Sequence, residues 1–249
     1  VLAARPSMGK TSLAMNIVEN ISLGRGNKGQ KKPVGVFSLE MSSLSLALRM
    51  LCSSAKVSME SVMKGFVSND RHHRLADAAA DLSQATICLD DSGTMDITEL
   101  RGRARRMKKR FGIELVVVDY LQLLHAGESA MQGRQQETAS ISAYLKAMAK
   151  ELQIPVLVLS QLSRAPDQRD KTGKPKLSDL RDSGAIEQDA DLVWLLRRPC
   201  KYPDDDEYQD KTLAIVDVAK NRNGSTGEVR LNFIEEFTLF EDRVEDRIL

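Results

Sequence analysis

The chain has 249 residues, of which 42% are hydrophobic and 29% charged, and its formal net charge at pH 7 is +1. This balance is typical of one large globular domain, and it excludes a protein that holds nucleic acid through its overall charge. No apolar run approaches the ~20 residues that span a bilayer, and there is no recognisable signal sequence. The three cysteines have no C-x-x-C spacing, which favours a reducing compartment. We therefore expect a cytoplasmic protein without membrane association.

Residues 4–11, A-R-P-S-M-G-K-T, have the spacing of a phosphate-binding loop. They fit G-x-x-x-x-G-K-[ST] when alanine is accepted at the first position. In such loops, backbone N–H groups and the lysine hold nucleotide phosphates, and the hydroxyl residue binds Mg²⁺. An apolar run precedes the loop and a helical apolar periodicity follows it; because that run begins at residue 1, we expect the chain to be part of a longer protein. The residues expected to bind nucleotide here are Ser7, Met8, Gly9, Lys10, Thr11 and Ser12.

Three later apolar runs, each predicted to be a buried strand, lead into a polar side chain. These side chains are Glu40, Asp119 and Gln161. In open parallel α/β sheets, ligands bind beyond the carboxyl ends of the strands, so we expect all three near the nucleotide. The run L-V-V-V-D that ends at Asp119 also matches the second nucleotide motif, in which a carboxylate orders Mg²⁺.

The alternation of strands and helices predicts an α/β fold with a mostly parallel central sheet flanked by helices. The dipeptide Asn223-Gly224 between two apolar runs predicts an antiparallel hairpin near the carboxyl terminus. The expected strands cover residues 1–3, 34–38, 86–89, 115–119, 156–160, 192–196, 212–218 and 228–233, with an edge strand at 239–240.

Two polar features have a structural interpretation as well as a functional one. Residues 58–83 indicate a helical insert, and its adjacent His72 and His73 would point about 100° apart on a helix, which favours solvated surface over a metal site. A helix that begins at Ser42 or Ser43 should bury most of its leucines, Leu44 included. Arg49 lies on this helix, and the residues alone favour a surface arginine with a packed stem.

Six segments together closely resemble the family of bacterial replicative DNA helicases, DnaB, over nearly the whole chain and in family order. The resemblance implies that residues 1–249 are the RecA-like carboxyl-terminal motor domain, with the amino-terminal domain and linker helix absent. It also implies ATP and Mg²⁺ at subunit interfaces, a ring of six subunits in the full-length protein, 5′-to-3′ movement on single-stranded DNA, and primase and helicase-loader partners. The segments are residues 3–11, 37–41, 118–123, 159–164, 179–191 and 220–224.

The resemblance also implies roles for single residues at the nucleotide. Lys10 and the loop amides would hold the β- and γ-phosphates, while Thr11 and Asp119 would hold Mg²⁺. Glu40 would orient or deprotonate the attacking water, and Gln161 would sense the γ-phosphate. The family also places an arginine that matches Arg49 near the phosphates, which favours the functional interpretation of that residue.

Two further groups of residues would act outside the subunit's own nucleotide site. Arg222, with Lys220, would reach into the neighbouring subunit's site as a finger that neutralises transition-state charge. Arg181, Asp182 and Gly184 would contact the DNA backbone, and Asp182 stands where the family usually has glutamate. Two alternatives remain: another RecA-like DNA-dependent ATPase of the recombinase type, and an inactive nucleotide-binding scaffold.

Overall fold

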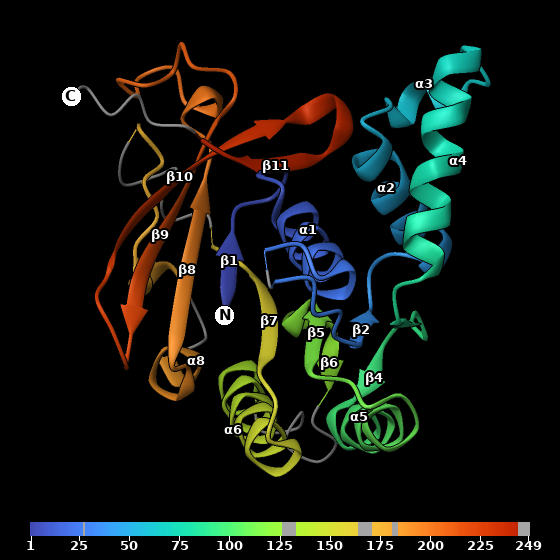
Figure 1. Ribbon diagram of the computed structural model, residues 1–249. Coiled ribbons are helices and arrows are strands. Elements are labelled where there is room, and N and C mark those ends of the chain that lie inside the picture. Colours follow the sequence, from blue (N-terminus) through green and yellow to red (C-terminus); the bar gives the residue numbers. More distant parts are fainter. Residues whose placement is uncertain (27, 126–132, 164–170, 181–183, 244–249) are drawn as a thin grey trace.

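A nine-stranded sheet organises the part of the chain that the computed structural model describes, which is residues 1–26, 28–125, 133–163, 171–180 and 184–243 (Figure 1). Six neighbouring strands are parallel. The three strands nearest the carboxyl terminus continue the sheet at one edge, each antiparallel to its neighbour. Across the sheet the order is β11 (Leu239–Asp242), β10 (Gly227–Ile234), β9 (Leu213–Asn221), β8 (Leu192–Arg197), β1 (Leu2–Ala4), β7 (Val156–Gln161), β5 (Leu115–Asp119), β2 (Val34–Ser38) and β3 (Ile87–Asp90).

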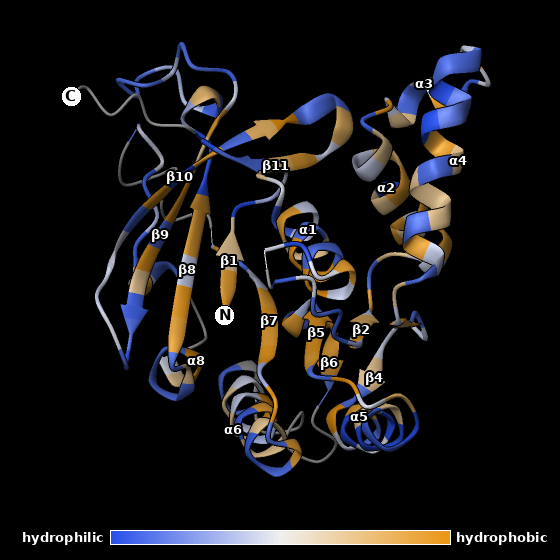
Figure 2. Cartoon of the chain, in the orientation of Figure 1, coloured by the Kyte–Doolittle hydropathy of each residue, from blue (hydrophilic) through white to orange (hydrophobic). Residues whose placement is uncertain are grey.

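Helices cover both faces of the sheet because its strands alternate buried apolar residues between two faces. One face, with Val36 and Val117, packs on α1 (Lys10–Leu23) and α2 (Ser43–Ala55). The other, with Val116 and Val118, packs on α5 (Ile97–Phe111), α6 (Arg134–Leu152) and α8 (Gly184–Asp189). Figure 2 shows the resulting pattern, in which apolar strands lie inside and α5 turns a hydrophilic side outward.

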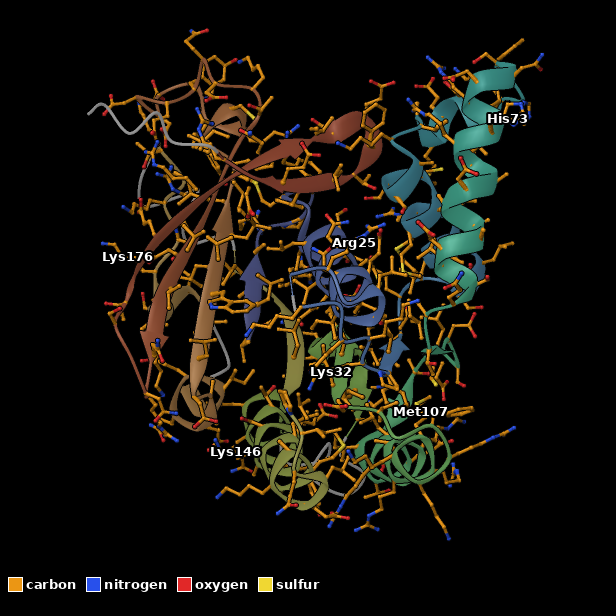
Figure 3. The ribbon with its side chains drawn as sticks, viewed as in Figure 1. Arg25, Lys32, His73, Met107, Lys146 and Lys176 are labelled. Carbon is orange, nitrogen blue, oxygen red and sulfur yellow. The ribbon has the colours of Figure 1, made fainter. Side chains whose placement is uncertain are left out.

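The remaining elements are peripheral. A short pair, β4 (Met95–Asp96) and β6 (Leu124–His125), forms a separate two-stranded sheet. The expected helical insert is present as α3 (Met59–Met63) and α4 (Asn69–Ser83), with the break that Gly65 predicts between them. Figure 3 places His73 on α4 at the edge of the molecule, where the histidine is exposed. Among the described residues, no cluster of three or more His, Cys, Asp or Glu side chains could hold a metal ion, and no helix is long and apolar enough to cross a membrane.

The carboxyl-terminal hairpin is confirmed, with β9 and β10 paired antiparallel and β11 added as the predicted edge strand. The expectation for Leu44 is wrong, because its side chain is 78% exposed. Leu44 lies in the first turn of α2, where the chain has only begun to approach the sheet, while Leu46 is fully buried. Helical periodicity gave the correct face further along this helix but not at its start.

Candidate nucleotide-binding site

A cavity of about 370 Å³ opens beyond the carboxyl ends of the central parallel strands. The loop after β1 forms its floor, and Glu40 and Gln161, from the ends of β2 and β7, form part of its wall. Asp119 ends β5, which lies between β2 and β7 in the sheet. The arrangement is the one that strand direction predicts, because parallel strands deliver their carboxyl ends to one edge. Side chains far apart in the sequence therefore meet at one place.

The loop at residues 5–9 leads directly into α1, so the helix points its amino-terminal N–H groups into the cavity. Gly9 precedes the helix with a φ of 94°, and a Cβ added there would lie 3.0 Å from the Phe240 ring. Glycine is therefore required both by backbone conformation and by the close approach of β11. The first-turn N–H groups of a helix have no intrahelical acceptor, so Lys10, Thr11 and Ser12 present donors suited to an anion.

Three polar groups lie close together at the start of α1 and the end of β5, namely the half-buried Lys10 and Thr11 and the buried Asp119. The Thr11 hydroxyl donates a hydrogen bond to Asp119 Oδ2 at 2.7 Å, and Asp119 is fully buried. Burial raises the pKa of Asp119, although the Thr11 hydrogen bond and the Lys10 charge oppose that change. Burial lowers the pKa of Lys10, opposed by the carboxylates of Asp119 and Glu40. Lys10 Nζ also lies 4.8 Å from the centre of the Tyr120 ring.

This group fits a divalent cation held through oxygen ligands. Asp119 Oδ1 is buried and has no hydrogen-bond partner among the described residues. Mg²⁺ takes hydroxyl, carboxylate and water oxygens, and an orphaned carboxylate oxygen beside a threonine hydroxyl supplies that chemistry. The geometry is therefore compatible with Mg²⁺ at Thr11 and Asp119.

Backbone contacts fix the segments that carry Glu40 and Gln161. The turn that carries Glu40 is tied to β5, because Leu39 N donates to Asp119 O at 2.7 Å. Gln122 Nε2 donates to the carbonyl oxygen of Gln161 at 3.1 Å. Both predicted side chains are exposed at the cavity, and their backbone is held in place. A side chain that contacts a bound ligand needs both properties.

Two arginines with unsatisfied N–H groups lie at the cavity. Arg49 lines it, and its buried Nε has no hydrogen-bond partner within the described part of the chain. Arg198, which sequence reasoning missed, is only 1% exposed and also lines the cavity. Its guanidinium lies 4.5 Å from the Phe233 ring centre and donates to Glu235 Oε2 at 2.9 Å. Its Nε and second terminal nitrogen find no acceptor among the residues described here.

A sequence signal for Arg198 did exist. Residues 192–196 form a predicted apolar strand, and two arginines follow it at the sheet edge where the other site residues lie. The rule that placed Glu40 and Gln161 at the cavity therefore also applies to the end of β8. The contact with Phe233 comes from the hairpin and could not be read from local sequence.

The remaining predicted site residues do not join the cavity. Arg222 and Lys220 lie at the far end of β9, where they contact the end of α8. Gly184 is exposed at the start of α8. Arg181 and Asp182 lie outside the described residues.

The chain is similar to several known proteins. Residues 1–242 match the model of the DnaB-like helicase C terminal domain. The chain is 40% identical over 240 residues to the replicative DNA helicase DnaB of Geobacillus stearothermophilus, which covers 96% of the chain and 51% of that protein. It is 42% identical over 251 residues to the DnaB of Haemophilus influenzae, covering 99% of the chain and 52% of the relative. The chain thus spans about half the length of the curated relatives it matches.

Two solved structures have the same fold. One, described as an ATPase domain, superposes with a TM-score of 0.88 at 34% identity, covering 97% of this chain and 83% of that one. A DnaB-like replicative helicase, described with its interactions with primase, gives 0.87 at 34% identity, covering 97% of this chain and 56% of the other. The RecA-like fold predicted from the sequence is confirmed.

Proposed function

This chain belongs to the family of DnaB-like helicase C-terminal domains, and on that premise we propose that it is an ATP-hydrolysing motor that moves along single-stranded DNA. The observation that carries the proposal is the cavity where the phosphate loop, Glu40, Arg49 and Gln161 meet. These are the components that ATP hydrolysis needs within one subunit. The proposed motor domain is the whole of residues 1–249.

Within the cavity, Lys10 and the amides of residues 7–12 would bind the phosphates. Thr11 and Asp119 would hold Mg²⁺, which would supply positive charge to the phosphates. Glu40 would orient and deprotonate the water that attacks the γ-phosphate. Phosphoryl transfer depends chiefly on positioning and charge stabilisation.

Three more side chains would contact the nucleotide. Gln161 would respond to the presence of the γ-phosphate, and Arg49 would add positive charge beside the phosphates. Arg198 would donate to the nucleotide from its two unpaired nitrogens, since a buried guanidinium with unpaired donors is costly unless a ligand pairs them.

Hydrolysis would be completed across a subunit interface. Arg222, with Lys220, would act on ATP bound to the neighbouring subunit of a six-membered ring in the full-length protein. Arg181, Asp182 and Gly184 would contact the DNA backbone in the centre of that ring, where backbone contacts give binding without sequence preference. The family resemblance is the basis for proposing the 5′-to-3′ direction, the unwinding of duplex at the replication fork, the cytoplasmic location and a helicase-loader partner. A primase partner is supported by the similar helicase structure that is described with its interactions with primase.

A recombinase-type ATPase would share the same cavity. The family match and the replicative helicases among the relatives favour the helicase. ATP-dependent unwinding of a forked duplex, assayed in the protein that carries this chain, would support the helicase. Homologous strand pairing without unwinding would instead identify a recombinase.

The substitution Glu40→Gln tests the proposed chemistry. It should leave nucleotide affinity within about threefold and lower turnover by at least ~100-fold, because it removes the base and keeps the shape of the side chain. Binding of a fluorescent ATP analogue and phosphate release, each with and without single-stranded DNA, measure the two effects. Retained hydrolysis would remove Glu40 from its proposed role, and a wild-type chain that binds ATP without DNA-stimulated turnover would favour the inactive scaffold.

A further inference from the structure

The carboxyl-terminal end of α8 holds both cations of the Lys220–Arg222 pair. Lys220 Nζ donates to the carbonyl oxygens of Glu187 at 2.5 Å and Gln188 at 3.2 Å. Arg222 donates to the Gln188 carbonyl at 2.7 Å and to Asp191 Oδ1 at 3.1 Å. The Arg222 backbone N–H also donates to Asp191 O at 2.9 Å. The last carbonyls of a helix lack intrahelical partners, so these cations satisfy groups that would otherwise need water.

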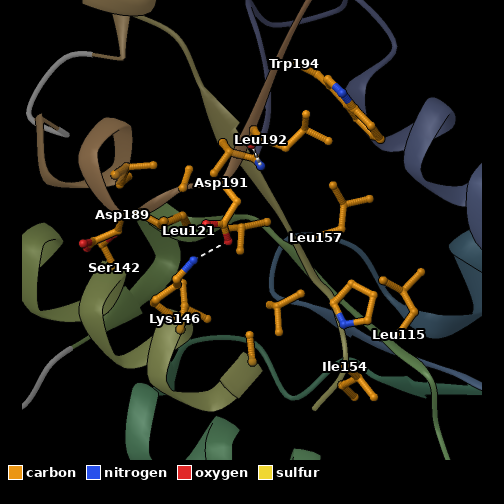
Figure 4. Close-up of a pocket in the computed structure, with 18 of the residues that line it drawn as sticks. Leu115, Leu121, Ser142, Lys146, Ile154, Leu157, Asp189, Asp191, Leu192 and Trp194 are labelled. Atoms are coloured by element: carbon orange, nitrogen blue, oxygen red, sulfur yellow. Dashed lines mark hydrogen bonds and ion pairs between the residues drawn. The ribbon is translucent and has the colours of Figure 1, made fainter. Parts of the chain in front are cut away.

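Asp191 is the charged centre of this contact. Its other carboxylate oxygen pairs with Lys146 of α6 (Figure 4), and these cations lower its pKa, the Lys146 hydrogen bond most. Asp191 therefore stays ionised between Lys146 and Arg222, anchored on one side and holding the guanidinium on the other.

A bulge in β9 turns the pair toward α8. Val193 pairs with Lys220 and Trp194 pairs with Val218, which leaves Ala219 as an extra residue in β9. One extra residue moves the side chains beyond it to the opposite face from the one that strict alternation would give. Lys220 and Arg222 consequently meet α8, so three separate features of the chain converge on the orientation of these two cations.

We propose that Asp191, at the end of α8, is a positioning residue that fixes the Arg222 side chain before it meets a neighbouring subunit's ATP. The inference rests on the proposed role of Arg222 as a finger acting across the interface. An unrestrained arginine would lose side-chain entropy on adopting one geometry. Asp191 and the α8 carbonyls remove that loss in advance, which is how preorganised groups contribute to catalysis.

The helix α8 connects a residue proposed to contact DNA with the carbonyls that hold Lys220 and Arg222. The helix has six residues, from Gly184, which is proposed to contact DNA, to Asp189, and a helix of that length is about 9 Å long. Any displacement of its first residue is carried to the carbonyls that hold Lys220 and Arg222. Loss of the Asp191 contact should therefore weaken the stimulation of ATP hydrolysis by DNA more than it weakens ATP binding.

The first test measures the order of the Arg222 side chain directly. Nitrogen-15 relaxation of the Arg222 Nε–H group, assigned by its loss in Arg222→Ala, should show a rigid group in the wild-type chain and a mobile one in Asp191→Asn. The matched control is Asp189→Asn, because Asp189 is the last residue of α8, two positions before Asp191, and accepts a hydrogen bond from Ser142 at 2.7 Å. Asp191→Glu keeps the charge and should restore most of the order. An equally rigid Arg222 in a folded Asp191→Asn chain would overturn the proposal.

The second test measures turnover with saturating single-stranded DNA. Asp191→Asn should lower kcat roughly three- to thirtyfold with little change in KM for ATP, as expected for loss of a coupling contact. Asp189→Asn should stay near the wild-type rate. A wild-type rate in Asp191→Asn, measured where Arg222→Ala is inactive, would overturn the inference and leave the proposed function standing. Full activity in Arg222→Ala would instead overturn the finger role, while the relaxation data would still decide whether Asp191 orders Arg222.

Discussion

The nucleotide cavity and the end of α8 differ in how their polar groups are satisfied. At the cavity, Asp119 Oδ1, Arg49 Nε and two nitrogens of Arg198 are buried without partners among the described residues. At the end of α8, the charged groups of Lys220 and Arg222 are paired, although the Arg222 side chain is 49% exposed. Buried unpaired groups are costly and mark places that a ligand completes. The cavity is therefore suited to a ligand bound within one chain, while the α8 end is ordered in advance and turned toward solvent.

The substitution Arg222→Ala should have the largest effect, because it removes the proposed finger and leaves the nucleotide cavity intact. A finger contributes about 10³- to 10⁵-fold to turnover in related phosphoryl-transfer enzymes, so the variant should lose at least ~1,000-fold in DNA-stimulated hydrolysis. Nucleotide affinity should stay close to wild type, because Arg222 lies outside the chain's own cavity. Phosphate release and nucleotide titration measure the two quantities, and Asn223→Ala in the same exposed turn is the control.

Mixed assemblies show where Arg222 acts. Arg222→Ala subunits retain Glu40, and Glu40→Gln subunits retain Arg222. A mixture should therefore recover part of the activity that each variant lacks alone, since some interfaces combine an intact site with an intact finger. Absence of recovery in assemblies shown by sizing to contain both variants would argue against action across the interface.

Sequence alone was sufficient to place the carboxyl edge of the sheet. Glu40 and Gln161 were placed at the cavity because buried parallel strands end at one edge, and that rule needs only the apolar runs and their direction. Even the relaxed first position of the phosphate loop did not matter, because Gly9 is the residue whose backbone requires glycine.

Contacts between segments far apart in the sequence could not be predicted in the same way. Arg198 is held by Phe233 and Glu235, which the hairpin brings from more than thirty residues away. The pairing of Asp191 with Arg222 depends on a bulge in β9 that no glycine in that strand indicates. Its pairing with Lys146 comes from a separate helix, α6. The predicted burial of Leu44 was wrong for a related reason. Periodicity identifies the buried face of a helix but not the point at which that helix reaches the sheet.

A third prediction tests whether the unpaired groups of the cavity serve the nucleotide. Arg198→Ala should weaken ATP binding about thirtyfold, equivalent to ~2 kcal/mol, because it removes charge-assisted hydrogen bonds in a dry site. The control is Lys201→Ala, since Lys201 also approaches Glu235, at 3.4 Å, but does not line the cavity. Isothermal titration with a non-hydrolysable analogue measures the affinities. Unchanged affinity in a folded Arg198→Ala chain would mean that its free N–H groups face no part of the ligand.

The smallest effect concerns the rigidity of the cavity wall. Asn16 is 6% exposed and joins three elements, since its side chain donates to Ser53 Oγ of α2 at 3.1 Å and accepts from Phe240 N of β11 at 2.8 Å. Phe240 in turn packs against Gly9 of the phosphate loop. Asn16→Ala leaves the Phe240 N–H buried and unpaired, so it should lower the free energy of unfolding by about 1–3 kcal/mol, measured by urea denaturation. Asn20→Ala, one turn along α1 at an exposed position, should cost less than about 0.5 kcal/mol. Equal losses in the two variants would show that the contact from α1 to β11 adds no stability, and the order of the cavity would then have to come from the loop and sheet alone.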